Sequence, residues 1–341
     1  MQSIDLHVGL RDGSLGPEEL RAINAADFSV PNAAGTTALH TAARYGRLGE
    51  LPPEILTPRN LLLRNDSGYT PLHHAASGAG LAGVPAEFLT HDNLLTRSNS
   101  GYTVYHVAAG NGCLGDLPAG LLTSEVIAIR NDLGQNLLHE AAEQGTLDKF
   151  PRDQITATTL ATTNASGETV VHVAALNGHL DQVPSELITI EVLLSKTHSG
   201  DTVLHAAAIA GNLGQIPDSF LTHDNLTISS KTGFTAIHAA AETGQLSHIP
   251  VEHLTTDLLL HRNDHGDTPL HAAAYEGHLD QIPTKLLTPE IVQVRNYNGV
   301  SVLRTAAVQG NLDQLPDSIR PKPPGPLRRI LDKLGLTRPP Y

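Results

Sequence analysis

The sequence contains 341 residues, and its 40% hydrophobic and 17% charged residues are typical of a folded chain with an apolar core. The net charge of −13 makes nucleic acid a poor partner, the single cysteine excludes a disulfide framework, and the lack of a long apolar run excludes a membrane span. With no basic, apolar leader at its start, the chain is expected to be a soluble, monomeric protein of the cytoplasm.

A motif recurs along the chain with a fixed period of 33 residues. Each of nine copies has a glycine, an Ala-Ala pair, a leucine and a proline at constant positions relative to a central histidine, which the ninth copy replaces by Arg304. A fixed period predicts one elongated repeat array, divided into a degenerate N-terminal capping repeat (1–31), nine repeats (32–319) and a tail (320–341). The histidines are His40, His73, His106, His139, His172, His205, His238 and His271.

Each copy begins with the signals of a short helix. Thr stands three residues before the histidine in seven copies, and Asn136 and Ser301 replace it in the other two. These residue types are good N-caps, and the histidine then occupies the third helical position, where a polar side chain can reach back to the cap. A glycine such as Gly277 ends the helix. We therefore predict helices of about eight residues, stabilised by their neighbours, and a structural role for all eight histidines.

The second half of each copy follows a pattern seen in LDQIPTKLLT, residues 279–288. Because proline breaks a long helix, Pro283 is predicted to begin a short helix, and Thr288 is predicted to cap another. The aromatic residues Phe88 and Phe220 lie in this half and are predicted to belong to the core. The RND-x-G segment that follows is predicted to close the copy as a turn.

The segments GYTPLHHAA, GDTPLHAAAYEGHL and GETVVHVAALNGHL resemble ankyrin repeats in both motif and period. The resemblance implies an all-α fold, an ankyrin-type αα solenoid of about nine repeats plus a degenerate N-terminal repeat. It also implies a non-catalytic scaffold that binds a protein through its loop tips and the inner face of its first helices. The Pro and Thr residues in the second half depart from the usual ankyrin pattern, so the shape of that region is open.

Binding residues are expected where residue identity changes between copies. Aromatic side chains occur there early and late in the array, in a row expected to be exposed, with acidic ones between them. This order predicts a protein partner with a basic segment, held by aromatic contacts. The alternative for the aromatic residues is local packing between neighbouring loops. The predicted partner-binding residues are Tyr45, Tyr69, Tyr102, Glu168, Asp201, Ile209, Phe234, Asp267 and Tyr275.

The sequence gives less support to a metal-binding or catalytic function than to protein binding. Equivalent histidines in adjacent repeats are expected about 10 Å apart, too far to share one zinc ion. Cys113 takes a surface position of the repeat, and no phosphate-binding loop, catalytic triad or zinc motif is present. We therefore predict no catalytic residue, no cofactor and no metal.

The tail from residue 320 has six Lys or Arg against one acid, a charge of +5. Leu327, Ile330, Leu331 and Leu334 would share one face of a short basic helix. The tail could cap the last repeat, act as a linear motif for another protein or an anionic membrane, or be disordered. Two alternative functions follow: a scaffold that binds through this tail, and an ankyrin targeting module of a bacterial effector acting in a host cell.

Overall fold

The computed structural model describes residues 5–321, and their regular structure is all-α, as predicted. The chain forms two compact units, Met1–Ile188 (unit 1) and Thr189–Tyr341 (unit 2). No helix in the described part of the chain has the length and apolar character needed to cross a membrane. The predicted tail, residues 320–341, lies outside the described residues except for Arg320 and Pro321.

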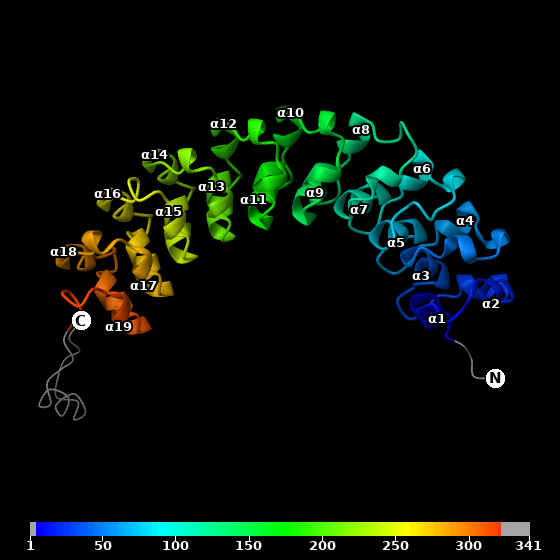
Figure 1. Ribbon diagram of the computed structural model, residues 1–341, viewed down its shortest axis with the longest axis horizontal. Helices are drawn as coiled ribbons and strands as arrows, with labels where there is room; N and C mark the ends of the chain where they lie inside the picture. The colour runs from blue at the N-terminus through cyan, green and yellow to red at the C-terminus, as the bar shows by residue number, and fades with distance from the viewer. Residues whose placement is uncertain (1–4, 322–341) are drawn as a thin grey trace, which may run out of the picture. The chain divides into compact units, whose positions relative to one another are not determined.

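Unit 1 contains a row of longer helices and a row of shorter ones (Figure 1). Neighbouring longer helices pack against each other, and α1 packs on α3. The longer helices are α3 (Ala38–Arg44), α5 (Pro71–Ser77), α7 (Val104–Gly110), α9 (Leu137–Gln144) and α11 (Val170–Asn177). The others are α1 (Leu6–Asp12), α2 (Pro17–Arg21), α4 (Pro58–Leu61), α6 (His91–Leu94), α8 (Ser124–Ile127) and α10 (Ala157–Leu160).

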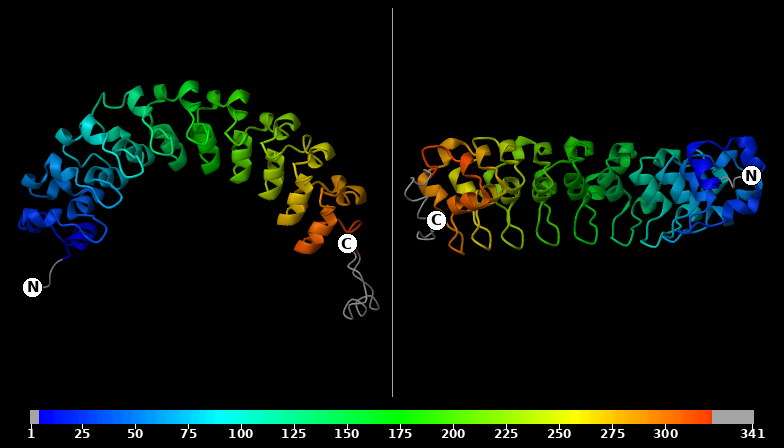
Figure 2. Two further views of the ribbon diagram at one scale, coloured as in Figure 1. Left: turned by 180° about the vertical axis from the view of Figure 1, so that it is seen from behind. Right: turned by 90° about the horizontal axis from the view of Figure 1, so that it is seen from below.

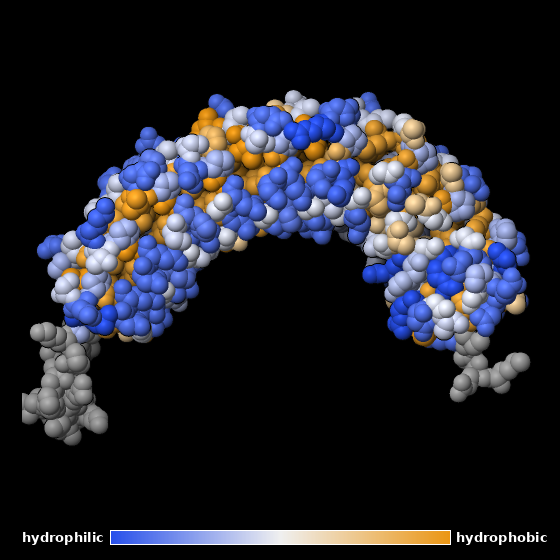
Figure 3. Space-filling view, in the orientation of Figure 1, coloured by the Kyte–Doolittle hydropathy of each residue, from blue (hydrophilic) through white to orange (hydrophobic). Residues whose placement is uncertain are grey.

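Unit 2 repeats this arrangement, with α13 packed on α15, α15 on α17 and α17 on α19. Its surface over the longer helices is mainly hydrophilic, and apolar surface forms a band between them and the shorter helices (Figure 3). The longer helices are α13 (Val203–Ile209), α15 (Ala236–Glu242), α17 (Pro269–Glu276) and α19 (Val302–Gln309). The shorter helices are α12 (Ile190–Leu193), α14 (His223–Leu226), α16 (Thr256–Leu259) and α18 (Pro289–Val292).

The longer helices begin at the predicted caps. In α7, the Thr103 hydroxyl oxygen accepts a hydrogen bond from the backbone N–H of His106. The Thr103 backbone N–H in turn donates to Nδ1 of His106 at 3.2 Å, a reciprocal capping box. The paired alanines that follow, Ala108 and Ala109 in this helix, are fully buried. Small side chains at this position let neighbouring helix backbones approach closely.

The opposite edge of the histidine ring links one repeat to the next, a contact that the sequence analysis did not foresee. Because Nδ1 of His106 accepts a backbone N–H, the neutral ring carries its proton on Nε2, which donates to the carbonyl oxygen of Gln135 at 3.2 Å. The same Nε2 contact, always with the residue 29 positions later, is made by His40, His73 and His139 in unit 1 and by His205, His238 and His271 in unit 2.

The second half of each repeat is more broken than predicted. Pro283 is the N-cap of the 3₁₀ turn Thr284–Leu286 and does not begin a helix itself, and a further 3₁₀ turn, Leu279–Gln281, precedes it. Thr288 does cap a helix, since its hydroxyl accepts from the backbone N–H of Ile291. Phe88 is buried as predicted, whereas Phe220 is only partly buried.

These 3₁₀ turns recur with the repeat. In unit 1 they are η1 (Ala25–Ser29), η2 (Leu48–Glu50), η3 (Pro53–Ile55), η4 (Ala86–Phe88), η5 (Leu114–Asp116), η6 (Leu147–Lys149), η7 (Arg152–Gln154), η8 (Leu180–Gln182) and η9 (Ser185–Leu187). In unit 2 they are η10 (Leu213–Gln215), η11 (Asp218–Phe220), η12 (Leu246–His248), η13 (Leu279–Gln281), η14 (Thr284–Leu286) and η15 (Leu312–Gln314). Each is a single turn, so no long second helix forms in the described repeats.

The loops before the longer helices project to one side of the helices in each unit (Figure 2, right). Successive loop tips are hydrogen-bonded, as in the bond from the backbone N–H of Asp264 to the carbonyl oxygen of Thr232 at 3.3 Å. The motif glycine explains this close approach. Gly233 has a φ of +70°, and a Cβ there would lie 2.8 Å from the backbone nitrogen of Asp264. Both the backbone conformation and the adjacent tip therefore require glycine.

Candidate functional site

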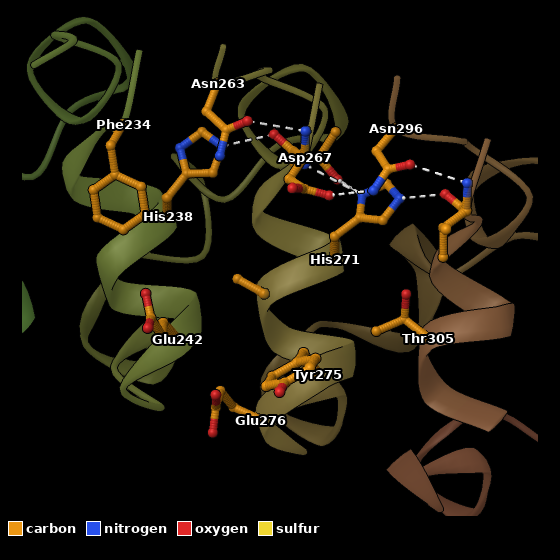
Figure 4. Close-up of a pocket in the computed structure, with 13 residues that line it drawn as sticks. Phe234, His238, Glu242, Asn263, Asp267, His271, Tyr275, Glu276, Asn296 and Thr305 are labelled. Atoms are coloured by element: carbon orange, nitrogen blue, oxygen red, sulfur yellow. Dashed lines mark hydrogen bonds between the residues drawn. The ribbon is translucent and has the colours of Figure 1, made fainter. Parts of the chain in front are cut away.

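A cavity of about 400 Å³ lies in unit 2 between the loop tips and helices α15, α17 and α19 (Figure 4). Phe234 enters it from the tip before α15, and Tyr275 from the last turn of α17. Tyr275 is 58% exposed, so its ring is available to a ligand. Two aromatic rings from different repeats thus flank one hollow, which is the usual composition of a protein-binding hot spot.

Three carboxylates surround this cavity. Glu242 and Glu276 are exposed on the last turns of α15 and α17, and Asp267 is half-buried at the loop tip. One carboxylate oxygen of Asp267 accepts a hydrogen bond of 2.7 Å from the Asn296 side chain, which fixes its position. Among the described residues that line the cavity there is no lysine or arginine. The lining therefore carries three acidic side chains and no Lys or Arg.

The histidines beside this cavity do not supply positive charge at neutral pH. Burial lowers the pKa of His238 to about 4, and burial also lowers the pKa of His271. Both rings donate through Nε2 to backbone carbonyl oxygens. They are therefore neutral positioning groups, and the site remains acidic and aromatic.

Unit 1 contains a cavity of similar size, about 390 Å³, between α3, α5, α7 and α9. Tyr69 and Tyr102 line it from two successive loop tips. The ring of Tyr69 lies edge-on to His73, with ring centroids 5.1 Å apart, and that of Tyr102 lies edge-on to His106 at 5.9 Å. These contacts hold both tyrosine rings in place at the mouth of the cavity.

A carboxylate that the sequence analysis missed, Glu140, also lines the unit 1 cavity. Its side chain accepts hydrogen bonds from the Asn131 amide at 3.0 Å and from the Tyr102 hydroxyl. It is only 5% exposed, and burial, followed by the charge of Glu143, raises its pKa to about 7. The only sequence signal was that the residue after the histidine varies, being Val107 in α7 and Glu140 in α9.

The predicted partner-binding residues fall into three groups. Phe234, Asp267 and Tyr275 share the unit 2 cavity, and Tyr69 and Tyr102 share the unit 1 cavity. The remaining four, Tyr45, Glu168, Asp201 and Ile209, line neither of these cavities.

The expectation that these aromatic side chains form an exposed row was wrong for three of them. Tyr69, Tyr102 and Phe234 are half-buried, because each ring packs on the histidine four residues later. Tyr45, at 42%, and Tyr275 are exposed. The half-buried rings therefore combine local packing with a place in the lining of a cavity.

The described residues give no support to a catalytic role for Cys113 or to a metal site. Cys113 is half-buried and does not lie freely on the surface, and burial raises the pKa of its thiol to about 11, so the reactive thiolate is scarce at neutral pH. Among the described residues, no group of three histidine, cysteine or acidic side chains is arranged to hold a metal ion.

The recurring helices, each packed on the next within its unit, define a helical repeat protein. The family model described as Ankyrin repeat matches residues 265–292, which contain Asp267, all of α17 and Tyr275. The chain therefore contains an ankyrin repeat, and ankyrin repeats are modules of protein–protein interaction. No curated protein matches the chain in sequence.

Proposed function

We propose that the chain is a non-catalytic scaffold whose unit 2 cavity binds a basic segment of a protein partner. The observation that carries this proposal is the combination of Phe234 and Tyr275 with three carboxylates and no cation in one cavity. A Lys or Arg side chain would gain both a counter-charge and an aromatic face there. The flanking apolar residues of the partner would contact the exposed ring of Tyr275.

The kinetic test uses an immobilised peptide with a central Lys-Arg-Lys flanked by leucines, and an analogue with Glu-Glu-Glu at its centre. The basic peptide should bind, and the acidic analogue should not. Phe234→Ala with Tyr275→Ala should accelerate dissociation, since truncation of buried interface aromatics commonly removes about 2 kcal/mol. Glu242→Gln with Glu276→Gln should slow association, with a smaller effect at high salt.

Glu252→Gln is the matched control, because Glu252 is an exposed acid of unit 2 outside the cavity. It should leave both rate constants unchanged. If neither double variant alters either rate constant while both remain folded, the unit 2 cavity is not the binding surface. Deletion of residues 322–341 then tests the alternative that the basic tail binds the partner.

The cytoplasm is the compartment we propose for this binding, with delivery into a host cell as the alternative. Both fit the interaction role of ankyrin repeats. A secretion assay on cells that produce the chain distinguishes them, since an effector would leave the producing cell and a resident scaffold would not.

A further inference from the structure

The unit 1 cavity combines a buried acid with two aromatic walls. Glu140 is more than nine-tenths buried, yet its side chain lines a cavity of about 390 Å³ beside Tyr69 and Tyr102. The charged residue that helps to raise its pKa is another acid, Glu143, whose carboxylate accepts a hydrogen bond of 3.0 Å from Gln135. A buried carboxylate is ordinarily paired with a cation or neutralised by a proton. Here the described chain supplies polar donors to Glu140 but no cation.

We propose that this cavity binds the guanidinium group of an arginine side chain from a protein partner, with Glu140 as its counter-ion and the rings of Tyr69 and Tyr102 as its walls. This site is separate from the unit 2 cavity and does not depend on the function proposed for it. The arginine would complete the missing half of a buried ion pair.

The geometry favours a guanidinium over other cations. A carboxylate offers about four acceptor positions, and Asn131 and Tyr102 occupy two of those of Glu140. The planar guanidinium can donate to the remaining positions and stack on a tyrosine face at the same time, whereas an ammonium group is more strongly hydrated. The chemistry of the partner is therefore a protruding arginine.

The charged and titratable groups around the cavity are compatible with this occupant. Arg44, from α3, is exposed at the edge of the cavity and is not among the groups that shift the pKa of Glu140. His74 and His106 also line the cavity, and burial lowers the pKa of each to about 4, so both are neutral above pH 6. On the α11 side, the Glu168 carboxylate accepts from Asn164 at 2.7 Å.

Binding of a cation should therefore be coupled to proton release. With a pKa of about 7, Glu140 is partly protonated at neutral pH in the free protein, and an adjacent guanidinium would favour the carboxylate. The proton then leaves on association, and affinity falls as the pH is lowered below 7. At pH 5.5 only roughly 3% of Glu140 would be ionised in the free protein, which corresponds to a loss of affinity of roughly 30-fold relative to pH 8.

The test is an NMR titration of the full chain with N-acetyl-arginine methylamide, using the citrulline analogue as a neutral probe of nearly the same shape. At pH 8 the arginine probe should shift the amide signals around Tyr102 and Glu140, and the citrulline probe should not. Glu140→Gln should lower the affinity for the arginine probe by at least ten-fold and should make that affinity independent of pH. Glu87→Gln, an exposed acid of the same unit outside the cavity, should change neither.

Equal binding of arginine and citrulline probes would overturn the proposal, as would arginine binding that is unchanged in Glu140→Gln or independent of pH. Tighter binding of the corresponding lysine probe would overturn the choice of guanidinium. The unit 2 variants Glu242→Gln and Glu276→Gln should leave these unit 1 signals unchanged, so failure of this site and failure of the proposed function are distinguishable.

Discussion

The two cavities share part of their lining positions, since a shift of 132 residues, or four repeats, converts Tyr102 into Phe234 and Glu140 into Ala272. The backbone framework is shared, but the negative charge is placed differently. In unit 1 it is buried beside the tyrosines, whereas in unit 2 it is exposed on Glu242 and Glu276. A buried carboxylate responds to protons, and exposed carboxylates respond to salt. One repeat framework therefore supports two kinds of electrostatic site.

We expect the burial of the recurring histidines to limit the stability of both units in acid, and this is the largest effect we expect. Burial lowers the pKa of His73, His106, His139 and His238 to about 4, so the folded state binds fewer protons than the unfolded state between pH 6.5 and 4. Their stabilisation is complete above pH 6.5 and is lost as the pH falls through this window, on the order of 10 kcal/mol in total. Urea unfolding at several pH values measures it.

His106→Gln provides the matched comparison, because glutamine can form a capping box and does not titrate. This variant should be less stable than the parent at pH 7. Its stability should also fall less steeply as the pH is lowered, because about one fewer proton is taken up on unfolding. An unchanged slope would show that His106 is not one of the groups responsible.

Glu140→Gln should give the second largest effect, confined to unit 1. The raised pKa of Glu140 means that the folded state binds more protons than the unfolded state between pH 4.5 and about 7, so stability falls as the pH rises through that window. The neutral amide removes this penalty. We expect a stabilisation of up to about 3 kcal/mol at pH 8 and little change at pH 4.5.

Hydrogen exchange of the α9 amides at both pH values measures the effect of Glu140→Gln locally, with α17 as the internal reference. Equal protection of α9 in parent and variant at pH 8 would contradict the buried-charge account. The control variant Glu87→Gln, which alters an exposed acid, should change the free energy of exchange of the α9 amides by no more than about 0.5 kcal/mol at either pH.

Ala272→Glu places a carboxylate at the unit 2 position that corresponds to Glu140 in unit 1. We expect it to change stability by less than Glu140→Gln does, and in the opposite direction. Asn263 corresponds to Asn131, but Phe234 lacks the hydroxyl that Tyr102 supplies. The new carboxylate should destabilise unit 2 by about 1–3 kcal/mol at pH 8. Adding Phe234→Tyr should recover part of the loss. Ala272→Gln is the neutral control, and the three variants are compared by urea unfolding at pH 8 and pH 5.

Removal of the exposed acids should have the smallest effect on stability. Glu242→Gln with Glu276→Gln should change the free energy of unfolding by no more than about 0.5 kcal/mol, because both side chains are exposed. Thermal unfolding at low and high salt measures this. A larger loss would mean that these acids support the fold and would undermine their assignment to binding.

The sequence was sufficient for the features that depend on local chemistry. The Thr cap, the histidine at the third helical position and the glycine at the helix end act within about ten residues, and the structure has all three. The Nε2 contact of His106 could not be predicted, because its acceptor on Gln135 is positioned only by the stacking of the next repeat.

The cavities were predicted only in part for the same reason. The variable tip positions indicated Tyr102 and Phe234, but whether a variable residue is buried depends on its neighbours in the stack. Glu140 follows the histidine, where other repeats have Thr, His, Val or Ala, and nothing in its local sequence shows that Asn131 and Tyr102 enclose it. The second half of each repeat is divided into short turns because of its proline positions. The sequence analysis predicted the effect of these prolines only approximately.

The Nε2 contact also gives the array a direction. Within each unit, the ring that caps one helix is oriented by a carbonyl of the repeat on its C-terminal side, as His238 is by Asp267. Removal of repeats from the amino end would leave a carbonyl that water can satisfy, whereas removal from the carboxyl end would release the capping ring of the repeat before it. Arg304, which takes the place of the histidine in the ninth copy, is exposed and has no ring to be oriented in this way. A shortened array should therefore keep this arginine-bearing copy as its final repeat.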